Sequence, residues 1–283
     1  MKPYMEHDMD LPNASASIPP SKPAELIQRI RSSLGDCLPA ERGHEKRDAA
    51  LRWLFLFHKS TPGLIRQVVG VQAAGYAAQL GRRNLTKTYL TDSVRGARVV
   101  MLTDLGLSVA EGMFPEHIGT YDTRWTSVRQ QFLVHDLMAQ KELLHVMDKH
   151  PVHRFLPERL AGRGDRSAGK RPDIQIWFPD GHLPFNLEIE RTSKNIGYEL
   201  DRALYASARA VHRNEVAGVI YVFINDPVAE LYKRTLTAPL PLWKKDEASA
   251  KWALTGKSWQ VPAEIQERFQ WIVRPELLHH FMV

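Results

Sequence analysis

The chain has 283 residues, enough for two compact domains, and its hydrophobic fraction of 43% is ordinary for a globular protein. The formal net charge of +6 suits a polyanionic partner such as nucleic acid. The single cysteine, Cys37, excludes an intramolecular disulfide and a site built from several cysteine ligands. No apolar run approaches the ~20 residues of a membrane span, so we expect a cytoplasmic protein without a membrane partner.

The first part of the chain is expected to consist of an arm and a compact domain. Residues 1–43 are expected to form a flexible arm with one short helix at 22–34. The first residues are polar, include prolines and show no periodic pattern of apolar side chains. Residues 44–113 form the expected domain, called the N-terminal module below. Its expected elements are a strongly apolar helix at 45–58, a short helix ending near Gly70, a helix at 72–83, β-strands at 86–90 and 97–102, and a helix capped by Thr103.

The helix at 72–83 is expected to carry a polar face. Gln72, Tyr76, Gln79 and Arg83 are spaced i, i+4, i+7 and i+11, so they share one side of the helix, and such side chains suit base edges and phosphates. The residues expected to face the core are Val71, Ala74, Ala78 and Leu80. The full set of expected DNA contacts is Gln72, Tyr76, Gln79, Arg82, Arg83, Lys87, Arg95 and Arg98.

Three helices followed by a two-stranded wing is the order of a winged helix, whose third helix enters the major groove of DNA. This run, with the segment 99–106 and its L-T-x-x-G turn, resembles the winged-helix superfamily. The resemblance implies double-stranded DNA as a partner. The alternatives are a three-helix packing module with a solvated polar face and a module that contacts protein.

Residues 126–283 are expected to form a second domain, called the C-terminal module below, which makes the chain α/β of the α+β type. Its expected elements are a helix at 126–149, strands at 153–157, 172–178 and 183–192, a helix at 196–213, a buried strand at 216–224, a segment at 228–236, a Lys-rich loop near Lys244, and a segment at 269–274.

Acidic residues are expected to meet on the hairpin around Asp180-Gly181. If that pair is a two-residue turn, opposed residues sum to 361, so Asp173 lies opposite Glu188 and shares a face with Glu188 and Glu190. A divalent cation would relieve their repulsion, and oxygen ligands without Cys favour Mg²⁺ or Mn²⁺. The alternative is a salt-bridged sheet face, with the carboxylates neutralised by Arg171 and by Arg191 or Lys194.

The hairpin motif resembles the P-D…(D/E)-x-K core of restriction-endonuclease-like nucleases, whose fold is α-βββ-α-β. Pro172-Asp173 is followed about fifteen residues later by Glu188-Ile189-Glu190. The resemblance implies that Asp173 and Glu188 bind metal. Glu190 occupies the lysine position of the motif, and Lys194 is the candidate for the missing positive charge.

An acidic residue from the preceding helix commonly completes such a site, and Asp136 is the candidate here. Phe132, Ala139 and Leu143 share its helix face, so it is expected to point inward, where an unpaired carboxylate is costly. Glu142 is the second candidate. We interpret His135 as a structural histidine rather than a ligand or proton carrier. The expected metal set is Asp136, Asp173, Glu188 and Glu190, with Lys194 completing the expected catalytic set.

The order of both modules resembles the replication-relaxation family and the MobC class of plasmid relaxases over residues 44–225. The motifs are His135-Asp136, P-D, E-x-E and the run 202–205, where Arg202 replaces the usual lysine. This resemblance implies metal-dependent nicking of DNA at an origin of transfer or replication, with other relaxosome or coupling proteins as further partners. Tyr198 or Tyr205 would attack in a relaxase, although a packing role is the alternative for each. The rival hypotheses are a non-catalytic DNA-binding accessory on an inactivated nuclease fold, and a transcriptional or copy-number regulator.

Overall fold

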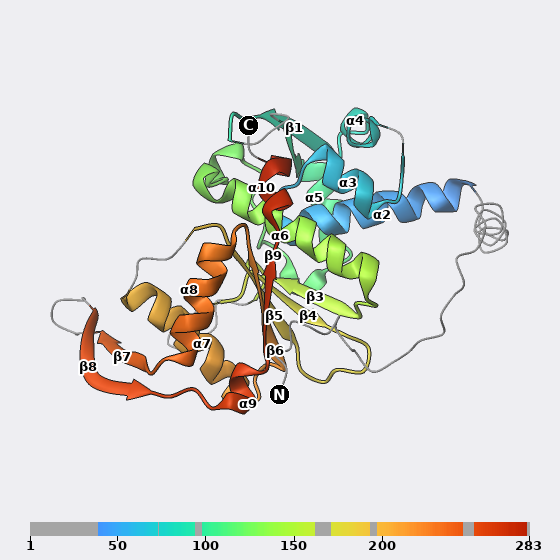
Figure 1. The fold of residues 1–283 in the computed structure, drawn as a ribbon. Coiled ribbons are helices and arrows are strands. Elements are labelled where there is room, and N and C mark those ends of the chain that lie inside the picture. The colour runs from blue at the N-terminus through green and yellow to red at the C-terminus, as the bar shows by residue number, and fades with distance from the viewer. Residues whose placement is uncertain are drawn as a thin grey trace.

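The computed structural model describes residues 39–72, 74–93, 98–161, 171–192, 197–245 and 252–281. The chain has an α+β fold, as expected. Its described strands form a central five-stranded sheet in the order β3-β4-β5-β6-β9 and two separate two-stranded sheets, β1-β2 and β7-β8 (Figure 1). The expected arm up to residue 38 lies outside the described residues, and so does its short helix.

The N-terminal module has the expected order of elements. They are α2 (Pro39–Phe57), α3 (Pro62–Val68), α4 (Tyr76–Arg82), β1 (Thr86–Leu90), β2 (Arg98–Leu102) and α5 (Asp104–Glu111). The side chain of Thr61 caps α3 by accepting the Leu64 N–H, and Pro62 occupies its first turn. Ser60 pairs with Val100 of β2. Residues 39–43 belong to α2, which corrects the expected end of the arm at residue 43.

The helix α4 is shorter than the expected span of 72–83. Gly75 precedes it with φ of 98°, a left-handed conformation that suits glycine, and the helix begins only at Tyr76. Leu80 is buried as expected. Ala74 and Ala78 are exposed, however, which corrects their assignment to the core.

The turn from β2 into α5 shows why the L-T-x-x-G pattern has this form. Thr103 accepts the Gly106 N–H with its side chain and so caps α5. A Cβ on Gly106 would overlap the carbonyl oxygen of Leu85, just before β1. Glycine therefore lets α5 pack directly on the start of the β1-β2 ribbon.

The C-terminal module begins with a long helix and continues with the central sheet. Two short 3₁₀ turns, η1 (Pro115–His117) and η2 (Trp125–Ser127), precede it. Its elements are α6 (Gln130–Lys149), β3 (Arg154–Pro157), β4 (Ile174–Trp177), β5 (Phe185–Glu190), α7 (Tyr198–His212), β6 (Gly218–Phe223), α8 (Asp226–Thr237), β7 (Leu240–Lys245), β8 (Trp252–Trp259), α9 (Ala263–Gln266), β9 (Phe269–Val273) and α10 (Pro275–Phe281). Lys244 lies in strand β7, which corrects its assignment to a loop.

The register of the central hairpin is the expected one. β4 pairs antiparallel with β5 through Ile174↔Leu187 and Ile176↔Phe185, so each pair sums to 361. The connection is wider than the expected two-residue turn, because pairing stops at Phe185 and the turn centres on Pro179 and Asp180. β3 pairs antiparallel with β4, whereas β6 pairs parallel with β5. The run from α6 to β6 therefore has the expected α-βββ-α-β order.

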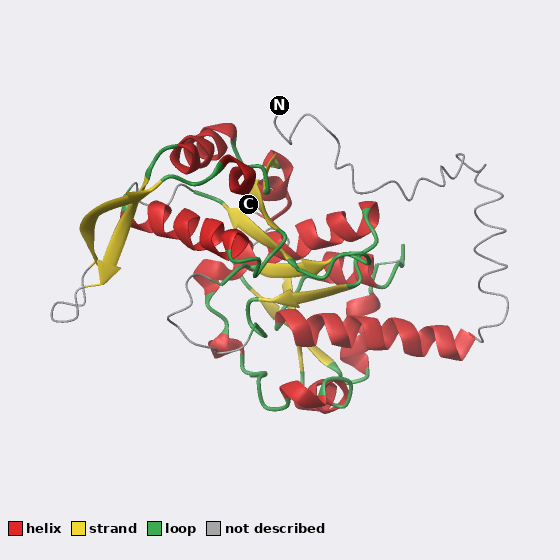
Figure 2. Cartoon of the chain, turned by 90° about the horizontal axis from the view of Figure 1, so that it is seen from below, coloured by secondary structure: helices red, strands yellow, loops and turns green. Residues whose placement is uncertain are grey.

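Helices cover both faces of the central sheet (Figure 2). Because side chains alternate along a strand, Leu187 and Ile189 point toward α6, and Tyr221 and Phe223 toward α7 and α8. The helix α7 buries the apolar stripe Leu200, Leu204, Ala208 and Val211 against this second face.

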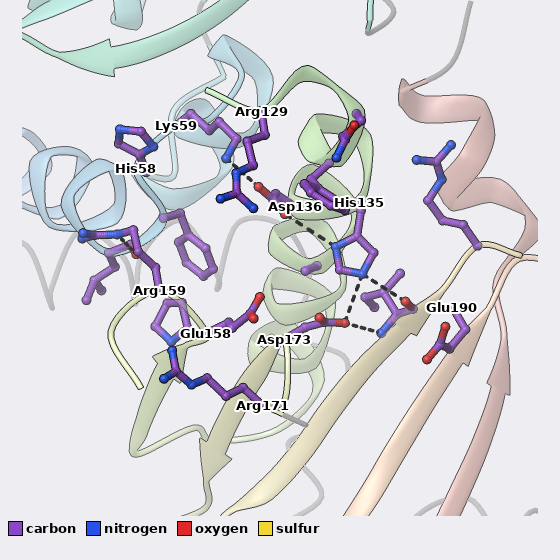
Figure 3. Close-up of a pocket in the computed structure, with 18 of the residues that line it drawn as sticks. His58, Lys59, Arg129, His135, Asp136, Glu158, Arg159, Arg171, Asp173 and Glu190 are labelled. Carbon is purple, nitrogen blue, oxygen red and sulfur yellow. Dashed lines mark hydrogen bonds and ion pairs between the residues drawn. The ribbon is translucent and has the colours of Figure 1, made fainter. Parts of the chain in front are cut away.

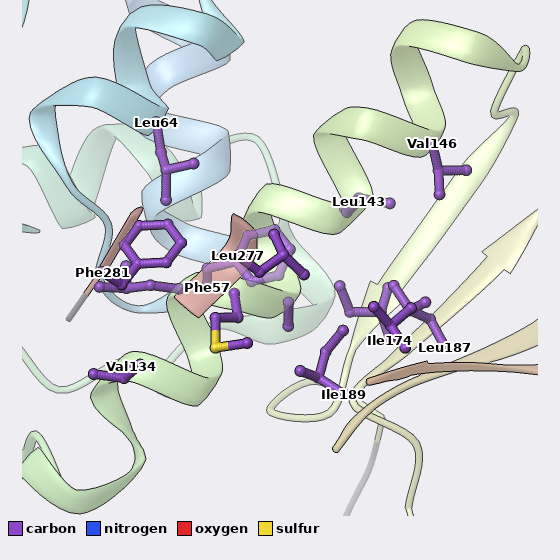
Figure 4. Close-up of a cluster of buried hydrophobic side chains, with 14 of the residues drawn as sticks. Phe57, Leu64, Val134, Leu143, Val146, Ile174, Leu187, Ile189, Leu277 and Phe281 are labelled. Carbon is purple, nitrogen blue, oxygen red and sulfur yellow. The ribbon is translucent and has the colours of Figure 1, made fainter. Parts of the chain in front are cut away.

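The two modules share one hydrophobic core on the α6 side of the sheet. Phe57 of α2 and Leu64 of α3 belong to the same buried cluster as Leu143 of α6 and Ile174 of β4 (Figure 4). The two modules are therefore packed directly against each other. A movement of one module relative to the other would disrupt this cluster. Within the described ranges, no helix combines the length and apolarity required to cross a bilayer.

Candidate functional site

A cavity of about 860 Å³ lies where the two modules meet (Figure 3). The N-terminal module contributes the end of α2 and the following residues, among them His58 and Lys59. The C-terminal module contributes the first turns of α6, the segment after β3 and the ends of β4 and β5. Side chains from distant parts of the sequence therefore face one space.

Lys59 is held at this junction by a constrained backbone. His58, the residue before it, has φ of 70°, which is uncommon for a residue other than glycine. The Tyr121 hydroxyl donates to the His58 carbonyl at 2.5 Å and accepts the Leu102 N–H at 3.0 Å. His58 Nε2 donates to the carbonyl of Asp122 at 2.6 Å. These bonds from the segment between the modules compensate for the unfavourable backbone conformation.

A buried amide fixes the same residue to α6. Gln140 is fully buried, and its Nε2 donates to the Lys59 carbonyl at 2.9 Å. Its Oε1 accepts the indole N–H of Trp53, on α2, at 2.8 Å. Both ends of the amide are thus satisfied, as a buried polar group requires.

Arg159 caps the C-terminal end of α2 next to the cavity. Its guanidinium donates to the carbonyl oxygens of Phe55 and Leu56, which lie in the last turn of α2, and stacks over the rings of Phe55 and Tyr121. A cation at a helix C-terminus is favourable, because the free carbonyls carry partial negative charge. Burial lowers the pKa of Arg159 to about 10, so it is still charged at neutral pH.

The acidic residues of the cavity form one network with two basic residues. Lys59 Nζ lies 2.5 Å from Asp136 Oδ2, and His135 Nδ1 lies 3.5 Å from Asp136 Oδ1. On its other side, His135 Nε2 lies 3.2 Å from Asp173 Oδ2 and 3.1 Å from the Ile189 carbonyl. Asp173 also accepts the Ile189 N–H at 2.7 Å. His135 therefore bridges the two aspartates.

The pKa values of His135 and Asp136 indicate that both of these residues are charged at neutral pH. Burial lowers the pKa of His135, but Asp173 and Asp136 outweigh it through charge and hydrogen bonding and raise the pKa to about 10. Burial raises the pKa of Asp136, but His135 and Lys59 outweigh it and hold the pKa below its usual range. At neutral pH a protonated His135 thus lies between Asp136 and Asp173, and Lys59 lies on the other side of Asp136.

The expected set of metal ligands is only partly brought together. Asp136, Asp173 and Glu190 line the cavity, whereas Glu188 does not. Glu188 is 2% exposed, and its register neighbour is Tyr221, so it lies on the sheet face toward α7 and α8. Asp173 precedes β4 and bonds to His135 of α6, which corrects the expectation that it shares a face with Glu188.

Other residues of the expected site lie apart from the cavity. Lys194 lies outside the described residues. Glu142, the second candidate on α6, is buried beside Arg274 and does not line the cavity, and burial raises its pKa. Tyr198 and Tyr205 do not line it either. Phe132 is 44% exposed and lines the cavity, which corrects its expected place on an inward apolar stripe.

The donor set does not fit a divalent cation as it is arranged. The charges of Asp136 and Asp173 are already matched by Lys59 and a protonated His135, and Glu188 lies on the other sheet face. Among the described residues, no group of three or more His, Cys, Asp and Glu side chains is placed to hold a metal ion. The geometry favours the salt-bridged alternative, and among the described residues Lys59 pairs with Asp136 and His135 with Asp173. Binding of Mg²⁺ or Mn²⁺ was predicted from the sequence alone, and calorimetry decides between it and the salt-bridged network.

Further cations line the cavity and suit an anionic group. They are Arg129, Arg159, Arg171 and Arg191. The Nε of Arg191 is buried and has no hydrogen-bond acceptor within the described part of the chain. A buried donor without an acceptor is costly, so a ligand oxygen at this position would be stabilised.

The expected DNA-contacting residues of the N-terminal module lie mostly on its surface. Those that are exposed are Gln72, Gln79, Arg82, Arg83, Lys87 and Arg98. Tyr76 is half-buried, and Arg95 lies outside the described residues. Lys87 Nζ sits 5.2 Å from the centre of the Tyr89 ring. The surface made by α4 and β1 therefore presents cations and amides to solvent, as a DNA-contacting surface requires.

Sequence reasoning named Arg171 and Arg191 but missed Lys59, Arg129 and Arg159. Lys59 stands between two helices without any motif around it, and only the packing of α2 on α6 brings it to Asp136. Its one sequence signal is a charged residue just before the Ser60-Thr61-Pro62 helix start. Comparisons with family models, with curated proteins and with solved structures returned no match for this chain.

Proposed function

We propose that this chain binds DNA, with a duplex on the α4–β1 surface and a backbone phosphate in the cavity between the modules. The carrying observation is that both modules line one cavity with a surplus of cations. The positively charged side chains of the lining outnumber the negatively charged ones. The positive ones are Lys59, Arg129, Arg159, Arg171, Arg191 and the protonated His135, and the negative ones are Asp136, Glu158, Asp173 and Glu190. Phosphate contacts from such side chains orient a protein on DNA without reading its sequence.

The residues of the cavity would hold a phosphate rather than cleave it. Arg191 offers a buried N–H, and Arg129 and Arg171 add charge around the cavity. Asp136 and Asp173 keep Lys59 and His135 in place, because each cation is fixed by an ion pair. No cleavage step follows from these contacts. This supports the hypothesis of a non-catalytic DNA-binding accessory, with action at an origin of transfer or replication as part of the same proposal.

Fluorescence anisotropy with a labelled 30-base-pair duplex tests the proposal. Arg82→Ala/Arg83→Ala removes two exposed charges from the end of α4. Because each lost phosphate contact reduces the salt slope by about 0.9, we expect affinity to fall about tenfold and the slope to become shallower by about 1.8. Arg129→Ala, at the mouth of the cavity, should weaken binding by a smaller factor.

A matched control removes the same charge elsewhere. Arg234→Ala/Arg268→Ala alters two exposed positions of the C-terminal module, away from α4. Its affinity should stay close to that of the wild type. Equal losses in both double variants would mean that net charge alone drives binding, and this would overturn the assigned surface.

A further inference from the structure

The β7–β8 hairpin meets α7 on the other side of the central sheet (Figure 1). Basic and aromatic side chains gather at this junction. An isolated two-stranded hairpin is marginally stable, so its contacts with α7 hold it in place. Trp243 donates its indole N–H to Asp201 at 3.1 Å, and Trp259 packs edge-on against Tyr205 and His212. Trp243 and Trp259 therefore both contact side chains of α7.

Positive charge accompanies these rings. The Arg202 guanidinium lies 3.3 Å from the centre of the Trp252 ring, and Lys244, Lys245 and Lys257 are exposed on the two strands. Strands β7 and β8 contain no Asp or Glu. The connecting residues 246–251, which lie outside the described structure, contribute two acidic residues and one lysine. The described hairpin therefore favours an anionic partner.

A cavity of about 410 Å³ opens at the base of this hairpin, within the range of small-ligand sites. Its lining is Tyr205, Arg209, His212, Arg213, Leu242, Ser258 and Trp259. Two arginines, a histidine and two large aromatic rings thus surround one hollow that has no carboxylate in its lining. Arg213 has an ion pair with Glu215 at 3.8 Å, but both side chains are more than half exposed, so this pair is weak.

We propose that this cavity and the β7–β8 hairpin bind single-stranded nucleic acid. A base would enter the cavity beside Trp259 and Tyr205, while the backbone phosphates would contact Arg209, Arg213 and the lysines of the hairpin. Aromatic rings combined with a cationic groove are the usual means of holding an unpaired strand. A duplex does not suit the cavity, because its bases are stacked and paired and cannot reach the rings. This inference does not depend on the α4–β1 surface.

Fluorescence anisotropy with a labelled dT20 oligonucleotide tests the inference on the full chain. Arg209→Ala/Arg213→Ala changes two exposed positions, one in the last turn of α7 and one just after it, so the fold is preserved. We expect at least a tenfold loss of dT20 affinity and a salt slope shallower by about 1.4. Arg82→Ala/Arg83→Ala is the matched control, which should lose duplex affinity and keep dT20 affinity. Trp259→Leu should weaken dT20 binding by about fivefold or more if a base stacks there.

Three results would overturn the inference. The first is dT20 binding that the Arg209→Ala/Arg213→Ala variant retains. The second is an abasic oligomer of the same length that binds as tightly as dT20, since this would mean that the cavity takes no base. The third is an acidic peptide of equal charge that displaces dT20 at equal concentration, which would identify the surface as a general polyanion or protein contact. If the Arg82→Ala/Arg83→Ala variant loses duplex binding and keeps dT20 binding, the result tests only the proposal for the α4–β1 surface.

Discussion

Lys59 Nζ lies 2.5 Å from Asp136 Oδ2, and this ion pair joins the end of the first long helix to the start of the second. The lysine side chain is 9% exposed and the aspartate 35%, so the lysine is largely removed from water and the aspartate is partly solvated. Removing the lysine leaves a partly desolvated carboxylate without its closest cation. The pair thus joins the two modules, and both of its members belong to the charged lining of the cavity.

Lys59→Met is expected to weaken both stability and DNA binding. Methionine keeps the length and the apolar stem of lysine, whereas Asp136 loses its closest cation. We expect the free energy of unfolding to fall by about 1–3 kcal/mol, between the values for exposed and buried pairs. Urea denaturation measures this change, and anisotropy with the 30-base-pair duplex measures the loss of affinity.

Lys141→Met is the matched control for this prediction. Lys141 also lies on the interface of the modules, where its Nζ donates to Gln67 at 3.1 Å, but its partner is neutral and the bond is exposed. Its loss should change stability by less than about 0.5 kcal/mol. If both methionine variants lose the same stability, the ion pair has no special role in joining the modules.

The bridge made by His135 predicts that stability depends on pH. The pKa of His135 is raised to about 10 in the folded state, mainly by Asp173 and Asp136 acting against burial, whereas the unfolded value is about 6.5. A raised histidine pKa gives stability that is fully present below pH 6.5 and is lost as pH rises toward 10. Urea denaturation between pH 6.5 and 9.5 should show this decline.

His135→Gln should make the decline shallower, because glutamine keeps a donor for the Ile189 carbonyl but does not titrate. His150→Gln is the control, since His150 ends the same helix and burial lowers its pKa. It should leave the slope above pH 6.5 as in the wild type. A His135→Gln profile parallel to that of the wild type would show that this histidine is not protonated in the folded state.

The sequence predicted local structure well where short-range chemistry decides it. Thr61 and Thr103 cap the helices that follow them, and the strand at 86–90 has the predicted bounds. The register of β4 and β5 is the one predicted from a two-residue turn at Asp180-Gly181, even though the observed turn is wider. A one-residue slip would have put Leu187 on the wrong face of the sheet.

The candidate site was less predictable, since it depends on contacts between distant segments. The sequence placed Asp136 and Asp173 together, but it gave no means of knowing that Lys59 and His135 would neutralise them. It also placed Glu188 with Asp173, because alternation was extended to a residue before the start of β4. At that position the chain has not yet entered the sheet, and the Asp173 side chain accepts the Ile189 N–H instead.

Gly106→Ala is expected to destabilise the N-terminal module strongly. The new Cβ would overlap the carbonyl oxygen of Leu85, and backbone on both sides leaves little room to relax. We expect a loss of about 3 kcal/mol or more, measured by urea denaturation. Gly81→Ala in α4 is the control, because the nearest atom to its Cβ is the Thr86 carbonyl oxygen at 3.6 Å. Alanine should stabilise that helix by up to about 1 kcal/mol, and equal losses at both glycines would contradict the close packing.

Calorimetry with Mg²⁺ and Mn²⁺ separates phosphate binding from metal-dependent cleavage. Because Lys59 and a protonated His135 already match the charges of Asp136 and Asp173, we expect no saturable heat of metal binding at neutral pH and no nicking of supercoiled plasmid. Glu188→Gln should behave as the wild type, since Glu188 lies on the other sheet face. Saturable Mn²⁺ binding that Asp173→Asn abolishes, together with nicking by the wild type alone, would replace the accessory hypothesis by that of a metal-dependent nuclease. In that case the metal would have to displace His135 from Asp173, and the pH at which binding appears would report the loss of the His135 proton.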